Sequence, residues 1–252
     1  MSPAGDILSP GPGSPPPAGP GLVETLNRRC RDADAEAILD AALDAFHPRL
    51  AFACSLGLED VALLDLAWRR GRRPRIFFLD TGRMHQETYD TLAAVRERYG
   101  LPIEVYVPRT EAVQALVAAK GPNSFYRSLE DRLECCRVRK VEPLARALAG
   151  AEAWLTGIRQ EQGETRDTAR PFQWDQANGG LVKVNPLVYW RLAEVWAYVR
   201  GRQVPYNPLH DRGYPSIGCA PCTRAVGPEE DPRAGRWWWE NPGTKECGLH
   251  RK

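Results

Sequence analysis

Cysteines carry the strongest chemical signal in this 252-residue sequence. One of the seven, Cys247, lies between Lys245 and His250, close to the C-terminus. A thiolate is the nucleophilic form of cysteine, and neighbouring cations favour it. Terminal segments are commonly mobile, so a thiol there suits reaction better than core packing. Taken alone, Cys247 is equally compatible with an incidental exposed residue, and the other cysteines decide between these interpretations.

Four cysteines form two pairs. Cys135 and Cys136 are adjacent, and Cys219 and Cys222 form a Cys-Ala-Pro-Cys motif. Such a set can hold a structural zinc or an iron–sulfur cluster, and a vicinal disulfide beside a redox-active CxxC is a third interpretation. Adjacent side chains on a helix point about 100° apart, which suits different corners of a cubane cluster better than one tetrahedral zinc. We therefore predict a [4Fe-4S] cluster on these four cysteines.

Lys140 follows the adjacent pair by about one helical turn, so its ammonium can reach a cluster sulfur or a bound anion. Cys30 and Cys54 have no partner at matching spacing, and we interpret them as core or incidental residues. No secretory signal precedes these cysteines, and in that context clustered cysteines are more often metal ligands or redox groups than disulfides. We expect a cytoplasmic protein.

The overall composition excludes several classes of function. With 43% hydrophobic and 26% charged residues, the chain has an ordinary globular composition. The net charge of +2 gives no reason to expect binding to nucleic acid, and no apolar run is long enough for a membrane span. We expect a disordered Pro/Gly-rich leader over 1–21, an α/β domain over 22–240 and a mobile tail over 241–252.

Strand-like and helix-like patterns alternate from residue 50 onward. This alternation predicts right-handed βαβ units and a parallel sheet. We expect an irregular C-terminal region from residue 206. The expected strands are 50–54, 75–79, 103–107, 153–156 and 182–184, and the expected helices are 23–46, 58–70, 86–99, 111–119 and 192–200.

Two loops follow the first two expected strands, where ligands bind in open α/β sheets. The first offers Ser55, Gly57 and a helix N-terminus to a phosphate. It lacks the Walker A pattern and fits a single phosphate or short anhydride better than a triphosphate. In the second loop, Asp80 and Thr81 can contact a purine or ribose, and Gly82 permits close backbone approach. Ordinary turns are the alternative for both loops.

Arginines form a third group near these loops. Arg159 and Arg166 follow the fourth expected strand, and Arg233 and Arg236 precede the C-terminal cysteine. The guanidinium fork suits oxyanions because it donates two parallel hydrogen bonds. We predict that Arg166, Arg233 and Arg236, together with Lys140, hold an anionic substrate group. Solvated surface charge is the alternative.

From about residue 25 to the end, the motifs occur in the order seen in assimilatory sulfonucleotide reductases, which the sequence therefore resembles. The paired cysteines resemble the branch that uses adenylyl sulfate (APS) and carries a [4Fe-4S] cluster. The branch that uses the 3′-phosphorylated nucleotide (PAPS) typically lacks them. The motifs are Ser55-x-Gly-x-Glu-Asp60, Leu79-Asp-Thr-Gly82, Glu134-Cys-Cys-Arg-x-Arg-Lys140, Cys219-x-x-Cys222, Arg233-x-x-Arg236 and Glu246-Cys-Gly-Leu-His250.

This resemblance implies a Rossmann-like parallel sheet of the adenine nucleotide alpha hydrolase type. It also implies thioredoxin-dependent reduction of APS to sulfite and AMP, in sulfate assimilation and cysteine biosynthesis. In that reaction Cys247 would attack the sulfate sulfur and become S-sulfocysteine, and thioredoxin would release sulfite. His250 would belong to the substrate site.

Three alternatives remain open at this point. The first is a PAPS reductase or an enzyme that accepts both nucleotides. The second is a non-catalytic iron–sulfur or zinc protein that senses adenine nucleotides and does not need Cys247. The third, an ATP pyrophosphatase of the tRNA-thiolation type, is disfavoured because the loop at Ser55 lacks the second glycine of Ser-Gly-Gly-x-Asp. A homo-oligomer is neither indicated nor excluded.

Overall fold

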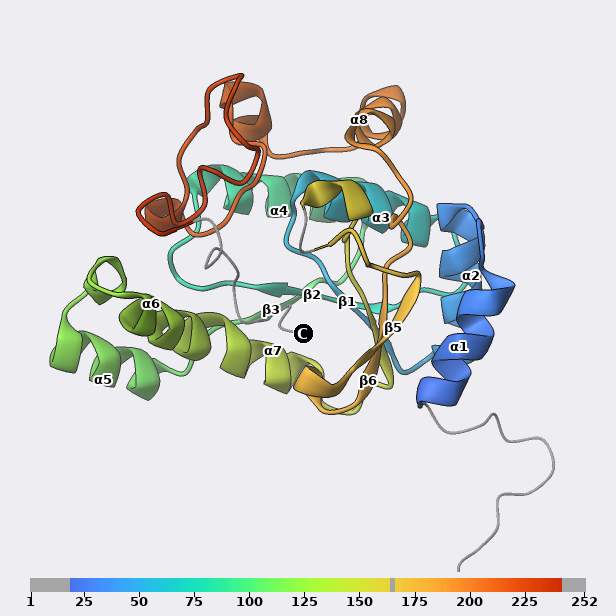
Figure 1. Cartoon of the computed structure of the whole chain (residues 1–252), viewed down its shortest axis with the longest axis horizontal. Coiled ribbons are helices and arrows are strands. Elements are labelled where there is room, and N and C mark those ends of the chain that lie inside the picture. The colour runs from blue at the N-terminus through green and yellow to red at the C-terminus, as the bar shows by residue number, and fades with distance from the viewer. Residues whose placement is uncertain (1–18, 164–165, 242–252) are drawn as a thin grey trace, which may run out of the picture.

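A six-stranded sheet lies between helical layers in the computed structural model, which describes residues 19–163 and 166–241 (Figure 1). The strand order is β3-β2-β1-β4-β6-β5. All neighbouring strands are parallel except β5, which runs antiparallel to β6. The strands are β1 Leu50–Ala53, β2 Arg75–Leu79, β3 Glu104–Tyr106, β4 Ala153–Leu155, β5 Phe172–Asp175 and β6 Leu181–Val184.

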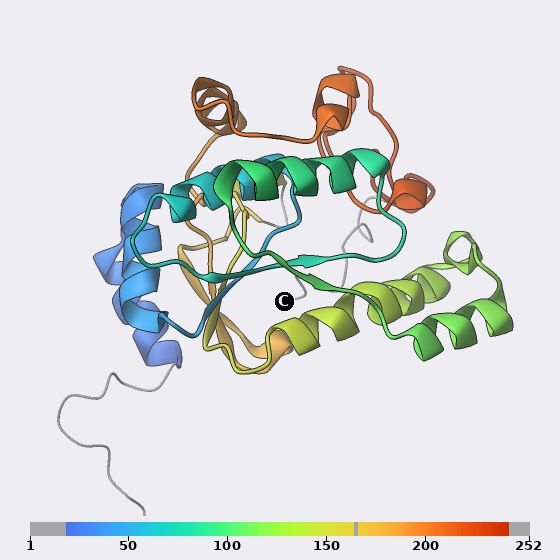
Figure 2. The ribbon, with the colours of Figure 1, turned by 180° about the vertical axis from the view of Figure 1, so that it is seen from behind.

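The helices cover both faces of the sheet. Helices α3 and α4 lie on one face, and α5, α6 and α7 lie on the other side (Figures 1 and 2). A π-helical turn, Arg137–Val141, joins α6 to α7. The α-helices are α1 Pro20–Arg29, α2 Ala35–Phe46, α3 Leu58–Trp68, α4 Gln86–Tyr99, α5 Thr110–Lys120, α6 Leu129–Cys136, α7 Glu142–Ala147 and α8 Leu192–Gly201.

Alternating strand residues build the two halves of the core, because successive side chains point to opposite faces. Phe52 and Phe78 enter the larger hydrophobic cluster, to which α2 and α3 contribute. Ala51, Phe77 and Trp154 enter a smaller cluster with α7. Both sets are buried, as expected for strands covered on both faces.

The expected parallel sheet is confirmed, and the second strand and the helix over 86–99 have the predicted bounds. The single helix expected over 23–46 is wrong. Two helices occupy this range, because Asp34 caps α2 by accepting from the backbone nitrogen of Ala37 at 2.8 Å. Strand β5 was not predicted. Within the described part of the chain, no helix is long and apolar enough to cross a membrane.

Candidate nucleotide and cysteine site

The strand order changes direction between β1 and β4, and the loops that follow these strands leave the sheet at this switch point. Ser55 lies in the loop after β1, and Gly157 lies in the loop after β4. A Cβ atom on Gly157 would lie 2.4 Å from Asp60 Oδ1, so only glycine lets the two loops approach so closely. Gly157 was not predicted as a site residue from the sequence, although its position just after an expected strand indicates a loop at the binding edge of the sheet.

Asp60 organises the loop after β1. Its Oδ2 atom accepts hydrogen bonds from the backbone nitrogen of Ser55 at 2.6 Å and from the Ser55 hydroxyl at 2.5 Å. The Ser55 oxygen in turn accepts from the backbone nitrogen of Gly57 at 3.3 Å. Leu56 adopts φ 63°, a left-handed conformation that is uncommon for a branched residue. The predicted phosphate loop is therefore held in one strained, hydrogen-bonded shape.

Burial raises the pKa of Asp60 to about 6, although the hydrogen bonds from Ser55 act in the opposite direction. An unfolded aspartate titrates near 4. The folded protein therefore holds this proton more tightly than the unfolded chain does. Ionisation of Asp60 consequently lowers the free energy of unfolding as pH rises from about 4 to about 6.

Replacing Asp60 with asparagine removes this titration. The free energy of unfolding of the wild type minus that of Asp60→Asn should fall by up to about 3 kcal/mol from pH 4 to pH 6, and then stay constant. Urea unfolding of both proteins across this range measures the difference. A flat profile for Asp60→Asn would contradict the raised pKa.

The loop after β2 turns sharply at Gly82, whose φ of 69° favours glycine. Asp80 Oδ1 accepts from the backbone nitrogen of Gly82 at 2.8 Å and from the Tyr89 hydroxyl at 2.9 Å. Thr81 is fully buried, and its hydroxyl lies 3.2 Å from the Cys219 sulfur. The Thr81 side chain therefore lies against the cysteines, which the sequence did not predict.

The two cysteine pairs come together although more than 80 residues separate them in sequence. Cys135 and Cys136 end α6, and Cys219 and Cys222 lie at a short 3₁₀ helix. Cys219 and Cys222 are buried in one hydrophobic cluster, against which Cys135 packs. The Cys136 thiol also acts electrostatically on Cys222, helping to raise the pKa of Cys222.

The six cysteines of the described part are thiols rather than disulfides, so a vicinal disulfide at Cys135 and Cys136 is not formed. Cys30 and Cys54 are buried in the large core cluster, as interpreted from the sequence. Among residues 19–163 and 166–241, no three His, Cys, Asp or Glu side chains form a group able to hold a metal ion.

Charge around the cysteines fits a thiolate-ligated cluster. Burial alone would raise the pKa of Cys219, but Lys140, the Thr81 hydroxyl and Arg236 outweigh it, and the pKa is lowered. Burial and the neighbouring Cys219 raise the pKa of Cys222 to about 12. A bound metal deprotonates its thiols, and nearby cations offset the resulting negative charge. Four partly or fully buried cysteines beside these cations therefore fit the predicted [4Fe-4S] cluster.

The π-helical turn after α6 carries the cations that face this site. Arg139 is buried and donates to the Thr81 carbonyl oxygen at 2.7 Å. The Lys140 ammonium favours the thiolate forms of Cys135, Cys219 and Cys222, although burial leaves the pKa values of Cys135 and Cys222 raised. Isolated π turns occur frequently at functional sites, because the extra residue changes which side chains face inward. Thr81 is thus contacted from both cysteine-bearing segments.

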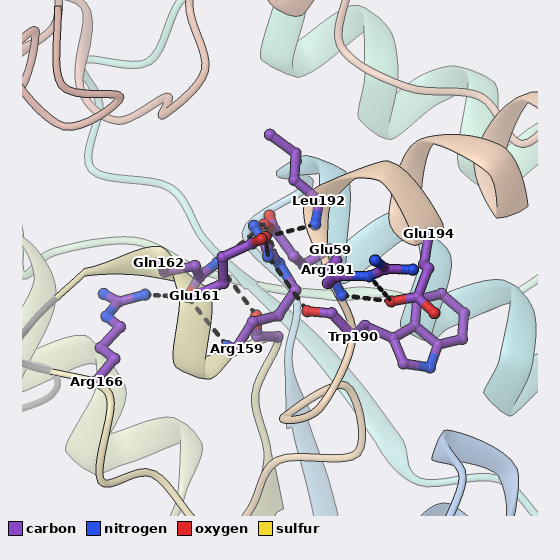
Figure 3. A network of polar contacts seen from close by, with 10 residues as sticks. Glu59, Arg159, Glu161, Gln162, Arg166, Trp190, Arg191, Leu192 and Glu194 are labelled. Carbon is purple, nitrogen blue, oxygen red and sulfur yellow. Dashed lines mark hydrogen bonds and ion pairs between the residues drawn. The ribbon is translucent and has the colours of Figure 1, made fainter.

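The loop after β4 contains a polar network around the buried side chain of Arg159 (Figure 3). Arg159 forms ion pairs at 2.9 Å with Glu59 and with Glu161. Gln162 donates to Glu59 at 2.9 Å and accepts from Arg166. The guanidinium of Arg159 is therefore paired with carboxylates, and its ion pair with Glu59 holds this loop against α3. Arg166 lies at the outer end of the network.

The other two predicted arginines lie in different surroundings. A Cβ atom on Gly163 would lie 4.0 Å from Arg233 Cδ, so the Arg233 segment runs beside the loop that carries Arg166. Arg236 is buried and donates to the Ser216 hydroxyl at 3.2 Å. The positive charge of Arg236 also helps to lower the pKa of Cys219, so Arg236 lies close to the cysteine pair Cys219 and Cys222.

The predicted residues thus form two neighbouring groups joined at Thr81, one at the nucleotide loops and one around the cysteines. Cys247 and His250 lie outside the described residues. The first group is Ser55, Gly57, Asp80, Gly82, Arg166 and Arg233, and the second is Thr81, Cys135, Cys136, Lys140, Cys219, Cys222 and Arg236. These features define an α/β protein with a switch-point loop site next to a four-cysteine site.

Comparison with known proteins gives the family. A model of the phosphoadenosine phosphosulfate reductase domain matches residues 49–225. Adenosine 5′-phosphosulfate reductase from Allochromatium vinosum is 52% identical over 231 residues, which cover 91% of this chain and 84% of that protein. The chain belongs to the phosphoadenosine phosphosulfate reductase domain family, and the resemblance found in the sequence is confirmed.

Solved structures agree on the fold. A crystal structure of PAPS reductase from Candida auris, in a phosphate complex, aligns with a TM-score of 0.69 and 29% identity, over 82% of this chain and 98% of that one. FMN adenylyltransferase from Candida glabrata aligns with a TM-score of 0.55 and 17% identity, over 89% and 78% of the two chains. The second likeness concerns the fold alone and agrees with the expected adenine nucleotide alpha hydrolase type.

Proposed function

We propose that this protein reduces APS to sulfite and AMP with thioredoxin as electron donor. The observation that carries this proposal is the junction at Thr81, where a nucleotide-loop residue contacts both Cys219 and Arg139. A nucleotide bound at the carboxyl edge of the sheet would then have its reacting end beside the cysteines and their cations. The 52% identity to a protein named adenosine 5′-phosphosulfate reductase supports APS over PAPS as the substrate.

In this proposal the loops after β1 and β2 bind AMP, and cations bind the sulfated end. The Ser55–Asp60 loop binds the phosphate through backbone N–H donors at the start of α3, because the Ser55 hydroxyl already donates its hydrogen to Asp60. Asp80 and the backbone at Gly82 face the nucleoside. Arg166, Arg233 and Lys140 neutralise the phosphosulfate. Arg236, which lies near the cysteines, adds positive charge to the same end of the site.

The reaction then divides into two displacements. The Cys247 thiolate attacks the sulfate sulfur of APS, the bond from sulfur to the bridging oxygen breaks, and AMP leaves with the electron pair. A thioredoxin thiolate next attacks the Cys247 sulfur, and sulfite leaves with the electron pair of the sulfur–sulfur bond. The second thioredoxin thiol resolves the mixed disulfide. Sulfur is thereby reduced by two electrons, and the thioredoxin dithiol is oxidised by two.

Cys135, Cys136, Cys219 and Cys222 would hold the [4Fe-4S] cluster, which when bound supplies a fixed charge and a cross-link between two segments. Thiols account for both electrons of the reaction. Lys140 acts between the cysteines and the substrate, because its ammonium interacts electrostatically with Cys135, Cys219 and Cys222. We place this activity in the cytoplasm, in sulfate assimilation toward cysteine, where reduced thioredoxin is available.

Turnover with each nucleotide tests the proposed function. Anaerobically purified protein with reduced thioredoxin should release sulfite from APS, whereas PAPS should give a kcat/KM lower by at least about a hundredfold, because no additional cation is assigned to a 3′-phosphate. Sulfite formation is measured with labelled nucleotide. Equal rates with APS and PAPS would favour the dual-specificity alternative, and no sulfite from either would favour a nucleotide sensor.

Variants in the same assay separate substrate binding from general surface charge. Arg233→Ala should weaken APS binding roughly ten- to a hundredfold, the effect of losing one charge-assisted contact. Arg212→Ala is the matched control, since Arg212 is exposed and forms an ion pair of 2.8 Å with Glu87. Equal dissociation constants for both variants would show that Arg233 is only surface charge.

A further inference from the structure

The last helical turn before the paired cysteines carries a buried arginine that the proposed chemistry does not use. Arg132 of α6 is 1% exposed. Its Nε and Nη2 atoms donate to the two carboxylate oxygens of Glu240 at 2.8 and 2.7 Å. This two-pronged geometry is the strongest form of a guanidinium–carboxylate pair. Glu240 lies one residue before the end of the described chain.

The segment between the second cysteine pair and Glu240 is held to the same place by further contacts. The backbone nitrogen of Trp237 donates to the Cys222 carbonyl oxygen at 3.1 Å, and that of Glu240 donates to the Trp237 carbonyl oxygen at 2.8 Å. The guanidinium groups of Arg132 and Arg236 lie over the buried ring of Trp237, 4.7 and 4.6 Å from its centroid.

Trp237 adopts φ 39°, in the left-handed region that costs a non-glycine residue free energy. Such a conformation persists only where the surroundings enforce it. The surrounding contacts come from both cysteine-bearing segments, α6 through Arg132 and the Cys219–Cys222 segment through its backbone. These contacts therefore hold the chain at Glu240.

We propose that the Arg132–Glu240 pair is an anchor that fixes the starting point of residues 242–252, so that Arg132 and Glu240 are positioning residues for Cys247. This inference rests on the proposed function, in which Cys247 is the nucleophile. Neither residue touches the substrate. Their contribution is to limit the volume that the Cys247 thiol can occupy relative to the nucleotide loops.

The size of the effect follows from chain length. Cys247 lies six residues beyond Asn241, and a chain of that length spans at most about 20 Å. Without the anchor, the last fixed point would be Trp237, whose backbone is held by Cys222, and Cys247 lies ten residues beyond it. Effective concentration falls roughly as the −3/2 power of tether length, which gives about a twofold loss. Lost orientation adds to this, so we expect the transfer step to slow by about three- to tenfold.

Glu240→Gln tests the anchor, because it keeps the side-chain shape and removes the carboxylate charge. Under single-turnover conditions without thioredoxin, AMP release from bound APS should slow by about three- to tenfold. The dissociation constant for APS should stay unchanged, because the nucleotide loops are untouched. Iodoacetamide should also label Cys247 faster in free Glu240→Gln, as mapped on the C-terminal peptide. An unchanged rate together with unchanged labelling would overturn the proposal.

Two further variants keep the test decisive if Glu240→Gln folds poorly. Arg132→Lys retains the charge and loses the fork, and Glu240→Asp retains the charge on a shorter stem, so both should show the same two changes in weaker form. Glu230→Gln is the matched control, since Glu230 forms an exposed pair with Arg224 at 2.6 Å in the same region. An effect of equal size in Glu230→Gln would also overturn the anchor.

The wild-type protein distinguishes failure of the anchor from failure of the proposed function. If wild-type protein forms an SO₃ adduct on Cys247 and the anchor variants form it equally fast, only the anchor is wrong. If wild-type protein forms no adduct on Cys247, the proposed function itself fails. Iodoacetamide labelling still measures the anchor in that case, because it depends on the accessibility of Cys247 and not on turnover.

Discussion

Replacing Cys247 with serine should abolish sulfite formation and leave APS binding intact. Cys247 lies outside both cysteine pairs and outside the nucleotide loops, so the two functions are separable. A hydroxyl cannot replace the thiol, because the second displacement needs a sulfur–sulfur bond for thioredoxin to attack. Steady-state sulfite release should fall below detection, while the dissociation constant for APS changes by less than about twofold.

The intermediate itself can be isolated. Wild-type protein mixed with APS and no thioredoxin should gain the mass of one SO₃ group on the C-terminal peptide and release one equivalent of AMP. Reduced thioredoxin should then discharge this adduct as sulfite. We predict that Lys245 and His250, which neighbour Cys247 in the sequence, keep its thiolate accessible near neutral pH, since positive charge stabilises the ionised form.

The other cysteines provide the internal control. Cys54 is buried, and burial raises its pKa well above the usual value, so it is a poor nucleophile in the folded protein. Burial likewise raises the pKa of Cys30. Turnover by Cys247→Ser, or an adduct mapped to Cys30 or Cys54, would rule out the mechanism proposed for the tail.

The sequence predicted the parallel sheet well where local pattern alone determines an element. The strand over 75–79 is a short apolar run between turn signals, and the helix over 86–99 ends at Gly100, which adopts φ 59°. Strand β5 depends instead on a distant partner. The Asn27 side chain donates to the Phe172 carbonyl oxygen at 2.8 Å and accepts from its backbone nitrogen at 3.1 Å. The periodicity of hydrophobic residues in a single sequence does not indicate such a contact.

Some features of the candidate site could likewise be predicted from local sequence, whereas others depend on distant contacts. The position of the nucleotide loops follows from strand ends, so Ser55 and Asp80 could be selected from the sequence. The direction in which a loop side chain points could not be predicted from the sequence. Thr81 faces a cysteine 138 residues later in the chain, and Arg159 pairs with a glutamate 100 residues earlier. The contact of Arg159 with Glu59 depends on the pairing of β4 with β1, and the contact of Thr81 with Cys219 depends on the C-terminal segment packing against the loop after β2.

Removing the second cysteine pair should eliminate iron from the protein. Wild-type protein purified without oxygen should contain about four iron and four sulfide ions per chain and absorb visible light, as a [4Fe-4S] cluster does. Cys219→Ser with Cys222→Ser should lose both iron and this absorbance. Cys30→Ser, which changes a cysteine of the large core, is the control and should retain them.

Loss of the metal should also loosen the surrounding structure, because the free energy of binding metal contributes to folding. Cys219 and Cys222 are joined to the β2 loop through Thr81, to Trp237 through a backbone hydrogen bond and to α6 through side-chain packing with Cys135. The double variant should therefore lower the melting temperature by about 5 °C or more, the shift that roughly 2 kcal/mol gives in a chain of this size. One zinc per chain without iron or sulfide would contradict the cluster, whereas unchanged stability with full loss of iron would contradict its structural role.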